Sequence, residues 1–476
     1  MKICINKMNY FMIYMAWFVC SCKKFVQIPA PVTQLVTTST FSNSGSATAA
    51  VTSLYTQMQF SSFNMSQTCG LLSDELNIGL TNNTSLIHYF KNAMASSSGT
   101  YAGPWVEAYK YIYQANTIIE QLDHSNALNK AIKDQLEGEA KFVRGFWFFY
   151  LVNCYGDIPL VLSSDYTINA NIARSPKNKV YQQIVADLTD AENLLSSNYV
   201  DGTDTTNTSE RVRPTKWAAI SLLARVYLYT KDFVNAEKMS TIVINNNSVY
   251  GIVDSLNDVF KANSKETIWQ LAVPLPTTIN TQDGYNFILI VPPASGGTAN
   301  TSLISSMLLD SFETGDLRRI KWIGAYTTKG IPAISYYFPY KYKVYRSSNV
   351  TEYTMILRLA EQYLIRAEAR AQQGSNLNDA IADLNMIRHR AGLADYMGTI
   401  DKTSILAAIL HEREVEFFCE WGHRWFDLIR TGNSNAVMSV ITPLKGGDWS
   451  SDWQLFPIPQ GEINLDHNLI QNPGYL

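Results

Sequence analysis

The sequence predicts a mainly α-helical fold: tetratricopeptide-like helical hairpins with a long irregular, loop-rich region and a few short strands. In two blocks, about 103–246 and 353–430, apolar residues recur every three or four positions, which is typical of packed helices. Between and before them, residues 61–102 are rich in Ser, Asn, Thr and Gly, and residues 250–350 carry Pro and Gly clusters. The blocks therefore predict a helical scaffold, and the intervening segments predict an irregular face.

The first residues resemble a secretion signal. Lys2 and Lys7 precede an uncharged run over 8–19, which is well short of the roughly 20 apolar residues that a spanning helix needs. We therefore expect residues 1–21 to be removed as a signal peptide.

The end of this run matches the pattern of a bacterial lipoprotein. In "VCSC", residues 19–22, Cys22 has an aliphatic residue three positions before it and a small residue directly before it. We expect Cys22 to carry the lipid anchor and residues 22–476 to form a single domain; an ordinary secreted protein is the alternative. Lys23 and Lys24 follow the cysteine and leave the final membrane leaflet open.

Composition excludes several classes of function. The chain has 38 basic and 41 acidic residues, so it lacks the basic surface that a nucleic-acid partner requires. Beyond the N-terminal region only Cys69, Cys154 and Cys419 remain, without CxxC or paired metal spacing. We expect neither a disulfide framework nor a metal or other cofactor.

Helices are expected in order along the scaffold. Pro104 suits a first helical turn, and residues 145–152 are apolar on nearly every side, which requires a helix covered all round. Two pairs look like copies of one hairpin with small residues at the contact, namely 214–230 with 232–246 and 353–373 with 376–391. The other expected helices are 103–123, 128–160 (ending near Gly156), 177–195 and about 402–420.

The loop-rich segments contain strand-like runs and many aromatic residues. "TIWQLAV" and "YNFILIV" read as short strands. Loops of this length inside a compact protein are usually functional. The segments 61–102 and 250–350 are therefore the expected ligand face.

No common catalytic motif is present. GxSxG, GxGxxG and Walker patterns are absent, and "HEREVEF" has Val415 where a second zinc-binding histidine would stand. Glu412, Glu416 and Glu420 share one helix face. They could flank a glycosidic bond, but we interpret them as a structural ion network with nearby cations: Arg358, Arg366, Arg370, Arg413, His423 and Arg424.

Six separated blocks resemble the SusD/RagB family of outer-membrane lipoproteins in Bacteroidetes. They are, in order, "CSCKKF", "LEGEAKFVRGFWFFYLVNCYGDIPLV", "RPTKWAAISLLARVYLYTKDFVNAEK", "ILRLAEQYLIRAEARAQQG", "EREVEFFCEWGHRWFDLIRTG" and "LFPIPQGEINLDHNLIQNPGY". The resemblance implies a non-catalytic, cell-surface nutrient-binding lipoprotein. It would bind an oligosaccharide or a peptide and deliver it to a SusC-like TonB-dependent transporter in the outer membrane.

Aromatic loop residues are the ligand-binding candidates, because a sugar ring stacks on an aromatic face while its hydroxyls find polar groups. The alternative for each ring is packing under a long loop, which is favoured for Trp105 and Trp269. Two other functions remain open: a surface glycoside hydrolase using the glutamate stripe, and a periplasmic tetratricopeptide-type adaptor. The candidates are Trp322, Tyr326, Tyr336, Tyr337, Tyr89 and Tyr101.

Overall fold

The computed structural model describes residues 40–59, 61, 64–97, 103–293 and 300–475. The expected signal peptide, Cys22 and Tyr101 lie outside these residues. Residues 41–476 form one compact unit. None of the described helices combines the length and apolarity needed to cross a lipid bilayer.

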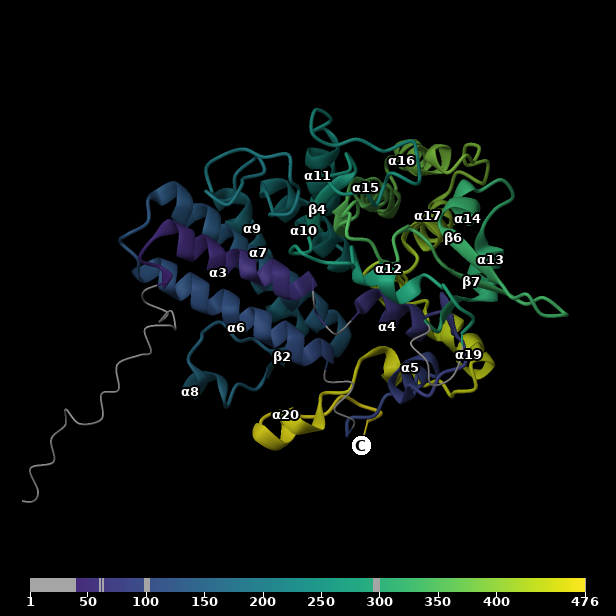
Figure 1. Cartoon of the computed structure of the whole chain (residues 1–476), viewed down its shortest axis with the longest axis horizontal. Helices are drawn as coiled ribbons and strands as arrows, with labels where there is room; N and C mark the ends of the chain where they lie inside the picture. The colour runs from purple at the N-terminus through teal and green to yellow at the C-terminus, as the bar shows by residue number, and fades with distance from the viewer. Residues whose placement is uncertain (1–39, 60, 62–63, 98–102, 294–299, 476) are drawn as a thin grey trace, which may run out of the picture. The chain divides into compact units, whose positions relative to one another are not determined.

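The prediction of a mainly α-helical fold is confirmed (Figure 1). The helices are α3 (Ser44–Gln59), α4 (Met65–Leu72), α5 (Thr84–Phe90), α6 (Gly103–His124), α7 (Lys130–Tyr155), α8 (Tyr166–Asn169), α9 (Lys177–Leu194), α10 (Lys216–Tyr229), α11 (Phe233–Ile244), α12 (Gln282–Phe287), α13 (Ser306–Ser311), α14 (Leu317–Lys321), α15 (Leu359–Gln373), α16 (Leu377–Arg390), α17 (Lys402–Phe417), α18 (His423–Arg430), α19 (Ser434–Leu444), the 3-10 helix η2 (Ser451–Gln454) and α20 (Gln460–Leu465).

Within the described part of the chain, short strands form four antiparallel pairs. They pair as β1 (Leu76–Ile78) with β5 (Ser302–Ile304), β2 (Ile158–Pro159) with β3 (Arg174–Ser175), β4 (Thr267–Leu271) with β8 (Thr354–Arg358), and β6 (Ile323–Thr327) with β7 (Ser335–Pro339).

The scaffold is a series of helices that pack on their neighbours. α6 packs on α7, α7 on α9, α9 on α10, α10 on α11, α11 on α15, and α15 on α16 and α17. Ala224 and Ala236 are fully buried where α10 meets α11, and Ala367 and Ala380 where α15 meets α16. Small side chains let both hairpins close tightly, as the sequence predicted.

The expected all-round burial of α7 is also observed. Every residue from Phe142 to Gly156 is buried, and Phe142 and Phe146 meet the ring of Trp269 edge-on. Trp269 and Trp105 are core residues, as expected.

Two predicted elements were wrong. The range 353–373 is not one helix, because β8 pairs with β4 before α15 begins at Leu359. "YNFILIV" is not a strand: the Thr281 side chain accepts a hydrogen bond from the Gly284 amide and caps α12 there. In both places a contact outside the segment decides the backbone conformation, whereas the local pattern is ambiguous.

The predicted glutamate stripe is a buried ion network, but only Glu412 and Glu416 lie on α17. The helix ends at Phe417, so Glu420 lies beyond it and does not share its face. Glu416 accepts hydrogen bonds from Arg318 (3.0 Å), from Arg358 (2.5 Å) and from Arg390. Glu412 pairs with Arg318 at 2.6 Å. We call the following set the central ion network: Glu266, Asp316, Arg318, Lys341, Arg358, Arg390, Glu412, Glu416 and Glu420.

The network joins the scaffold to the loop-rich region. Glu266 ends the loop before β4, Arg318 lies on α14, and Lys341 follows β7. Lys341 donates to the Glu416 carbonyl at 2.8 Å and to the Glu420 carboxylate. Burial alone would raise the pKa of Glu416, but Arg390, Arg358 and Arg318 outweigh it and hold that pKa below its ordinary value.

The structural interpretation of the stripe is therefore supported, although only one of the expected arginine partners is in the network. Arg358 binds Glu416 and Glu420. The remaining expected arginines pair elsewhere: Arg366 and Arg370 with Asp383, Arg413 with Asp427, and Arg424 with Asp74 and Glu414.

The Glu416→Gln variant tests the network. The change leaves three buried arginines without their shared counterion, and losing one partner of a buried ion pair costs about 3–5 kcal/mol. We expect the free energy of unfolding at neutral pH to fall by that amount in urea titrations followed by circular dichroism.

A matched control is Asp134→Asn, which breaks the solvent-exposed pair with Lys130 and should cost less than about 1 kcal/mol. Because the pKa of Glu416 is lowered on folding, its contribution is full above its unfolded pKa and is lost as the pH falls through its folded pKa. The difference between wild type and Glu416→Gln should shrink in acid; a difference that grew there would contradict this assignment.

Candidate functional site

The two loop-rich segments meet in the structure. β1 pairs with β5, with Leu76 opposite Ile304 and Ile78 opposite Ser302. The Gly79 amide extends the contact by donating to the Thr301 carbonyl at 2.6 Å. Segments separated by more than 200 positions in the sequence thus form one face, in which β5 also contacts β7 and α12. Figure 1 shows α12, β6 and β7 on the same side of the molecule.

A buried carboxylate fastens this face to the start of α4. Asp283 on α12 accepts hydrogen bonds from the Asn64 amide at 2.7 Å and from the Ser66 hydroxyl at 3.2 Å. Burial favours the protonated form of Asp283, whereas the hydrogen bonds from Asn64 and Ser66 favour the ionised form. Burial is the larger effect, and the pKa of Asp283 is raised to about 6. A small cavity of about 40 Å³ adjoins this junction, and Asp283 and Trp421 are among the residues that line it. Its size suits water rather than a sugar.

The main aromatic feature of the face is a tyrosine cluster. Three buried side chains, Ile288, Leu289 and Phe338, form its apolar base. Four tyrosines pack against this base: Tyr326, Tyr336, Tyr340 and Tyr345. A fifth, Tyr285, stacks on Tyr345. We call these five residues the tyrosine cluster.

Tyr285 and Tyr345 form a stacked pair within the cluster. Their ring centroids lie 5.3 Å apart with an interplanar angle of 20°. Arg346 is exposed, donates a hydrogen bond to the Tyr285 hydroxyl at 3.1 Å and lies over the same ring. Asn300 donates to the Tyr285 and Ile288 carbonyls at 2.6 and 2.9 Å and holds the end of α12. The result is a positioned, half-buried aromatic surface with hydrogen-bonding groups at its edge.

The β6–β7 hairpin divides three predicted ligand residues between its two faces. Tyr326 and Tyr336 are directly opposite each other and join the tyrosine cluster. Tyr337 pairs with Ala325, points to the other face and packs on the main core beneath Arg319. All three side chains remain partly exposed.

Trp322 is corrected from a ligand candidate to a core residue. Its side chain is 0% exposed, and its indole nitrogen donates to the Leu256 carbonyl at 2.9 Å. The ring covers the central ion network, with Lys341 and Arg390 4.8 and 5.4 Å from its centroid. A completely covered ring offers no face to a sugar.

Tyr89 is likewise a buried residue, on α5. It too presents no open ring face. Tyr101 lies outside the described residues and stays a prediction.

Sequence reasoning missed the Tyr285–Tyr345 pair as a ligand surface. Tyr285 was one of many loop aromatics, and its partner is sixty positions away in the sequence. No local spacing signals such a pair.

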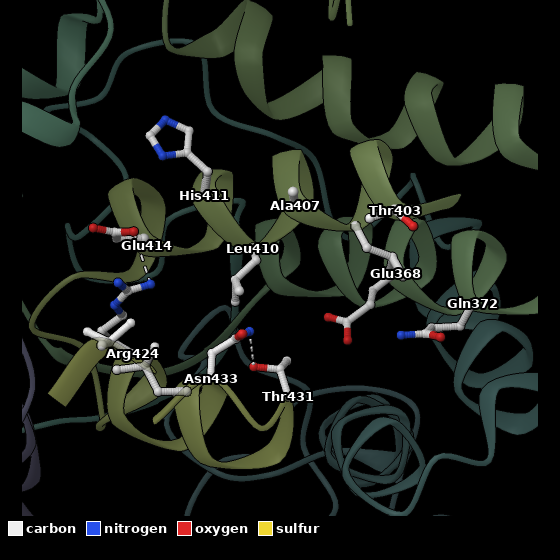
Figure 2. A pocket seen from close by; sticks show the side chains of 13 residues that line it. Glu368, Gln372, Thr403, Ala407, Leu410, His411, Glu414, Arg424, Thr431 and Asn433 are labelled. Carbon is white, nitrogen blue, oxygen red and sulfur yellow. Dashed lines mark hydrogen bonds and ion pairs between the residues drawn. The ribbon is translucent and has the colours of Figure 1, made fainter. Parts of the chain in front are cut away.

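A separate cavity of about 520 Å³ lies among α15, α17, α18 and α19. Figure 2 shows Glu414 and Arg424 facing each other at one end and Glu368 beside Gln372 at the other. Arg424 pairs with Glu414 at 3.0 Å, and Arg430 holds Glu368. The described lining carries no Tyr, Trp or Phe ring, so it offers no stacking surface for a sugar.

The described residues give no support to metal or glutamate-stripe chemistry. They contain no group of three His, Cys, Asp or Glu side chains placed to hold a metal ion. Glu412, Glu416 and Glu420 are buried in the central ion network and line neither of the two cavities described above. Among the described cysteines, Cys69, Cys154 and Cys419 are free and buried.

Two family models match the chain. One, described as "Starch-binding associating with outer membrane", matches residues 31–228, and a second, described as "SusD family", matches residues 320–475. Together they cover most of the sequence.

Individual proteins match along nearly the whole chain. A SusD-like protein P2 of Formosa agariphila is 26% identical over 502 aligned positions, covering 94% of this chain and 95% of that protein. A SusD superfamily structure from Bacteroides vulgatus superposes with a TM-score of 0.78 at 22% identity, covering 91% and 99% of the two chains. Surface glycan-binding protein A from Bacteroides thetaiotaomicron, solved in complex with laminarihexaose, superposes at 0.73 with 20% identity and 90% and 98% coverage.

Proposed function

The chain belongs to the SusD/RagB family, and from this we propose that it is a non-catalytic, cell-surface binding protein for an oligosaccharide. We further propose that a lipid on Cys22 anchors it to the outer membrane and that it delivers its ligand to a SusC-like TonB-dependent transporter. The single observation that carries the binding role is the tyrosine cluster on the loop-rich face.

The chemistry of the cluster fits a sugar. The half-buried rings of Tyr285 and Tyr345 are held in place by stacking and by Arg346, so little conformational entropy is lost when a ligand contacts them. Stacking the C–H face of a pyranose on such a ring removes apolar surface from water, which stabilises the complex. The phenol hydroxyls and Arg346 can bind the hydroxyls of the sugar. A structural relative bound to laminarihexaose supports the same ligand class.

The position of the glutamate stripe supports a binding role over hydrolysis. A glycosidase needs two carboxyl groups on either side of a bound glycosidic bond. Glu416 instead binds three arginines away from any described cavity.

The first experiment is titration calorimetry of the protein, begun after Cys22, with neutral hexasaccharides including laminarihexaose. We expect saturable heat and an unchanged ligand by mass spectrometry. The variant Tyr285→Ala/Tyr345→Ala should weaken binding by about tenfold or more, because each lost stacking contact is worth on the order of 1 kcal/mol.

Tyr285→Phe/Tyr345→Phe is the matched control, since it keeps both rings and removes only their hydroxyls. It should retain most of the affinity. Shortened ligand would replace the binding role by hydrolysis, and equal affinity of the alanine variant and wild type would remove the tyrosine cluster from the ligand site.

The anchor has a direct test of its own. Cells fed an alkyne-labelled fatty acid should incorporate label into the wild-type protein and into Cys20→Ser, whereas Cys22→Ser should lose it, because the thiol of Cys22 is the expected attachment point. Label that persists in Cys22→Ser would contradict the assignment.

A further inference from the structure

A large cavity lies apart from the tyrosine cluster, where α6, α8 and α20 come together. Its volume is about 650 Å³, within the range of small-ligand sites. In Figure 1 these helices occupy the lower left, whereas α12, β6 and β7 lie on the right. The cavity therefore belongs to a different part of the fold.

Aromatic residues line this cavity in a regular row. Trp105, Tyr109 and Tyr113 follow one face of α6 at four-residue intervals, so each ring is about 6 Å further along the helix axis. Trp105 is buried and forms the floor, and Tyr113 is 51% exposed. Tyr166 on α8 adds a fourth ring to the lining and is 79% exposed.

The exposed rings are not explained by packing. Large apolar side chains beside them are also open to solvent, including Val106 on α6 and Leu465 on α20, the latter 81% exposed. Exposed apolar groups gathered around a hollow indicate a binding site rather than core.

Hydrogen-bonding groups in the lining lack partners. The carboxylate of Glu462 and the hydroxyls of Tyr113 and Tyr166 make no hydrogen bond or ion pair with any described residue. The amide oxygen of Asn169 is buried without a hydrogen-bond partner among the described residues. An unpartnered acceptor of this kind calls for a donor from outside the chain.

The remaining charges define the ligand further. Asp466 adds a second carboxylate, and the one cation in the lining, Lys110, lies 3.4 Å from Glu107. The lining is therefore acidic, which disfavours uronates and sulfated sugars. A purely apolar ligand would displace water from these carboxylates without replacing the hydrogen bonds that the water made, which is unfavourable. Sugar hydroxyls donate well to carboxylates while the ring faces stack on tyrosine.

We propose that the cavity between α6, α8 and α20 is a second carbohydrate site, which takes an uncharged oligosaccharide on Tyr113 and Tyr166 with Glu462 accepting from its hydroxyls. The proposal rests on the carbohydrate-binding role above for its ligand class, but its residues are separate from the tyrosine cluster. Each site can therefore be removed without touching the other.

The test begins from Tyr285→Ala/Tyr345→Ala, which weakens the first site, and titrates it with laminarihexaose, cellohexaose and maltohexaose. We expect weak saturable binding of at least one of them. Adding Tyr113→Ala and Tyr166→Ala should weaken it by about tenfold or more, and Glu462→Gln should weaken it several-fold. Ligand should also slow amide exchange in α8 and α20 of the wild-type protein.

The matched control adds Ile320→Ala and Leu444→Ala, two exposed apolar residues outside this cavity, and should leave binding unchanged. Because Tyr113 and Tyr166 are exposed, their variants should unfold at the wild-type temperature. Two results would overturn the second site while leaving the first in place. One is the absence of residual binding in the starting variant, and the other is residual binding whose affinity does not change when Tyr113→Ala and Tyr166→Ala are added. Failure of every hexasaccharide to bind even wild type would overturn both.

Discussion

The carboxylate of Glu416 forms ion pairs with three arginines that lie on α14, β8 and α16. Such a group is stable only when every charge is paired, since an uncompensated ion in a dry interior costs several kcal/mol. The arrangement therefore fixes the relative positions of these elements more strictly than apolar packing would. Arg358 extends the constraint to β4 through Glu266, and Lys341 extends it to the chain that follows the β6–β7 hairpin. Trp322 covers the cations and excludes water from them.

The loop-rich face follows from this constraint. The β6–β7 hairpin lies between two members of the network, Arg318 before it and Lys341 after it, so both ends of the hairpin are fixed. Tyr326 and Tyr336 on the hairpin then join the apolar cluster of Ile288 and Leu289, which directly follow α12. Asp283 on α12 fastens that helix to the start of α4. Rigid placement is what a binding surface needs, because ordering loops on ligand contact would reduce affinity. The cavity near α20 is supported differently, by the regular face of α6.

The helical hairpins could be predicted from the sequence because their signals are local. Ala367, Ala380 and Gly374 sit within one short stretch, and Gly374 adopts the left-handed conformation that ends a helix. The four-residue spacing likewise indicated the shared helix face of Glu412 and Glu416, whereas Glu420 joins the network from beyond the end of α17. In contrast, Arg318 and Arg390 could not be identified as their partners, because the fold brings them together from distant positions. The same reason explains β8, whose apolar run also fits a helix until β4 is known to lie beside it. Trp322 looked like a ligand residue because only the tertiary structure shows the cations beneath it.

The most direct measurement of the central claim is amide hydrogen exchange, followed by mass spectrometry, on the wild-type protein and Glu416→Gln. If the central ion network holds the loop-rich face on the scaffold, exchange should accelerate together in β4, β8, α14, α16 and α17 and in the β6–β7 hairpin. The helices α6, α7 and α9, which contain no member of the network, should keep their wild-type rates. Acceleration confined to α17, or spread equally over all helices, would contradict the claim that this one group of charges positions the face.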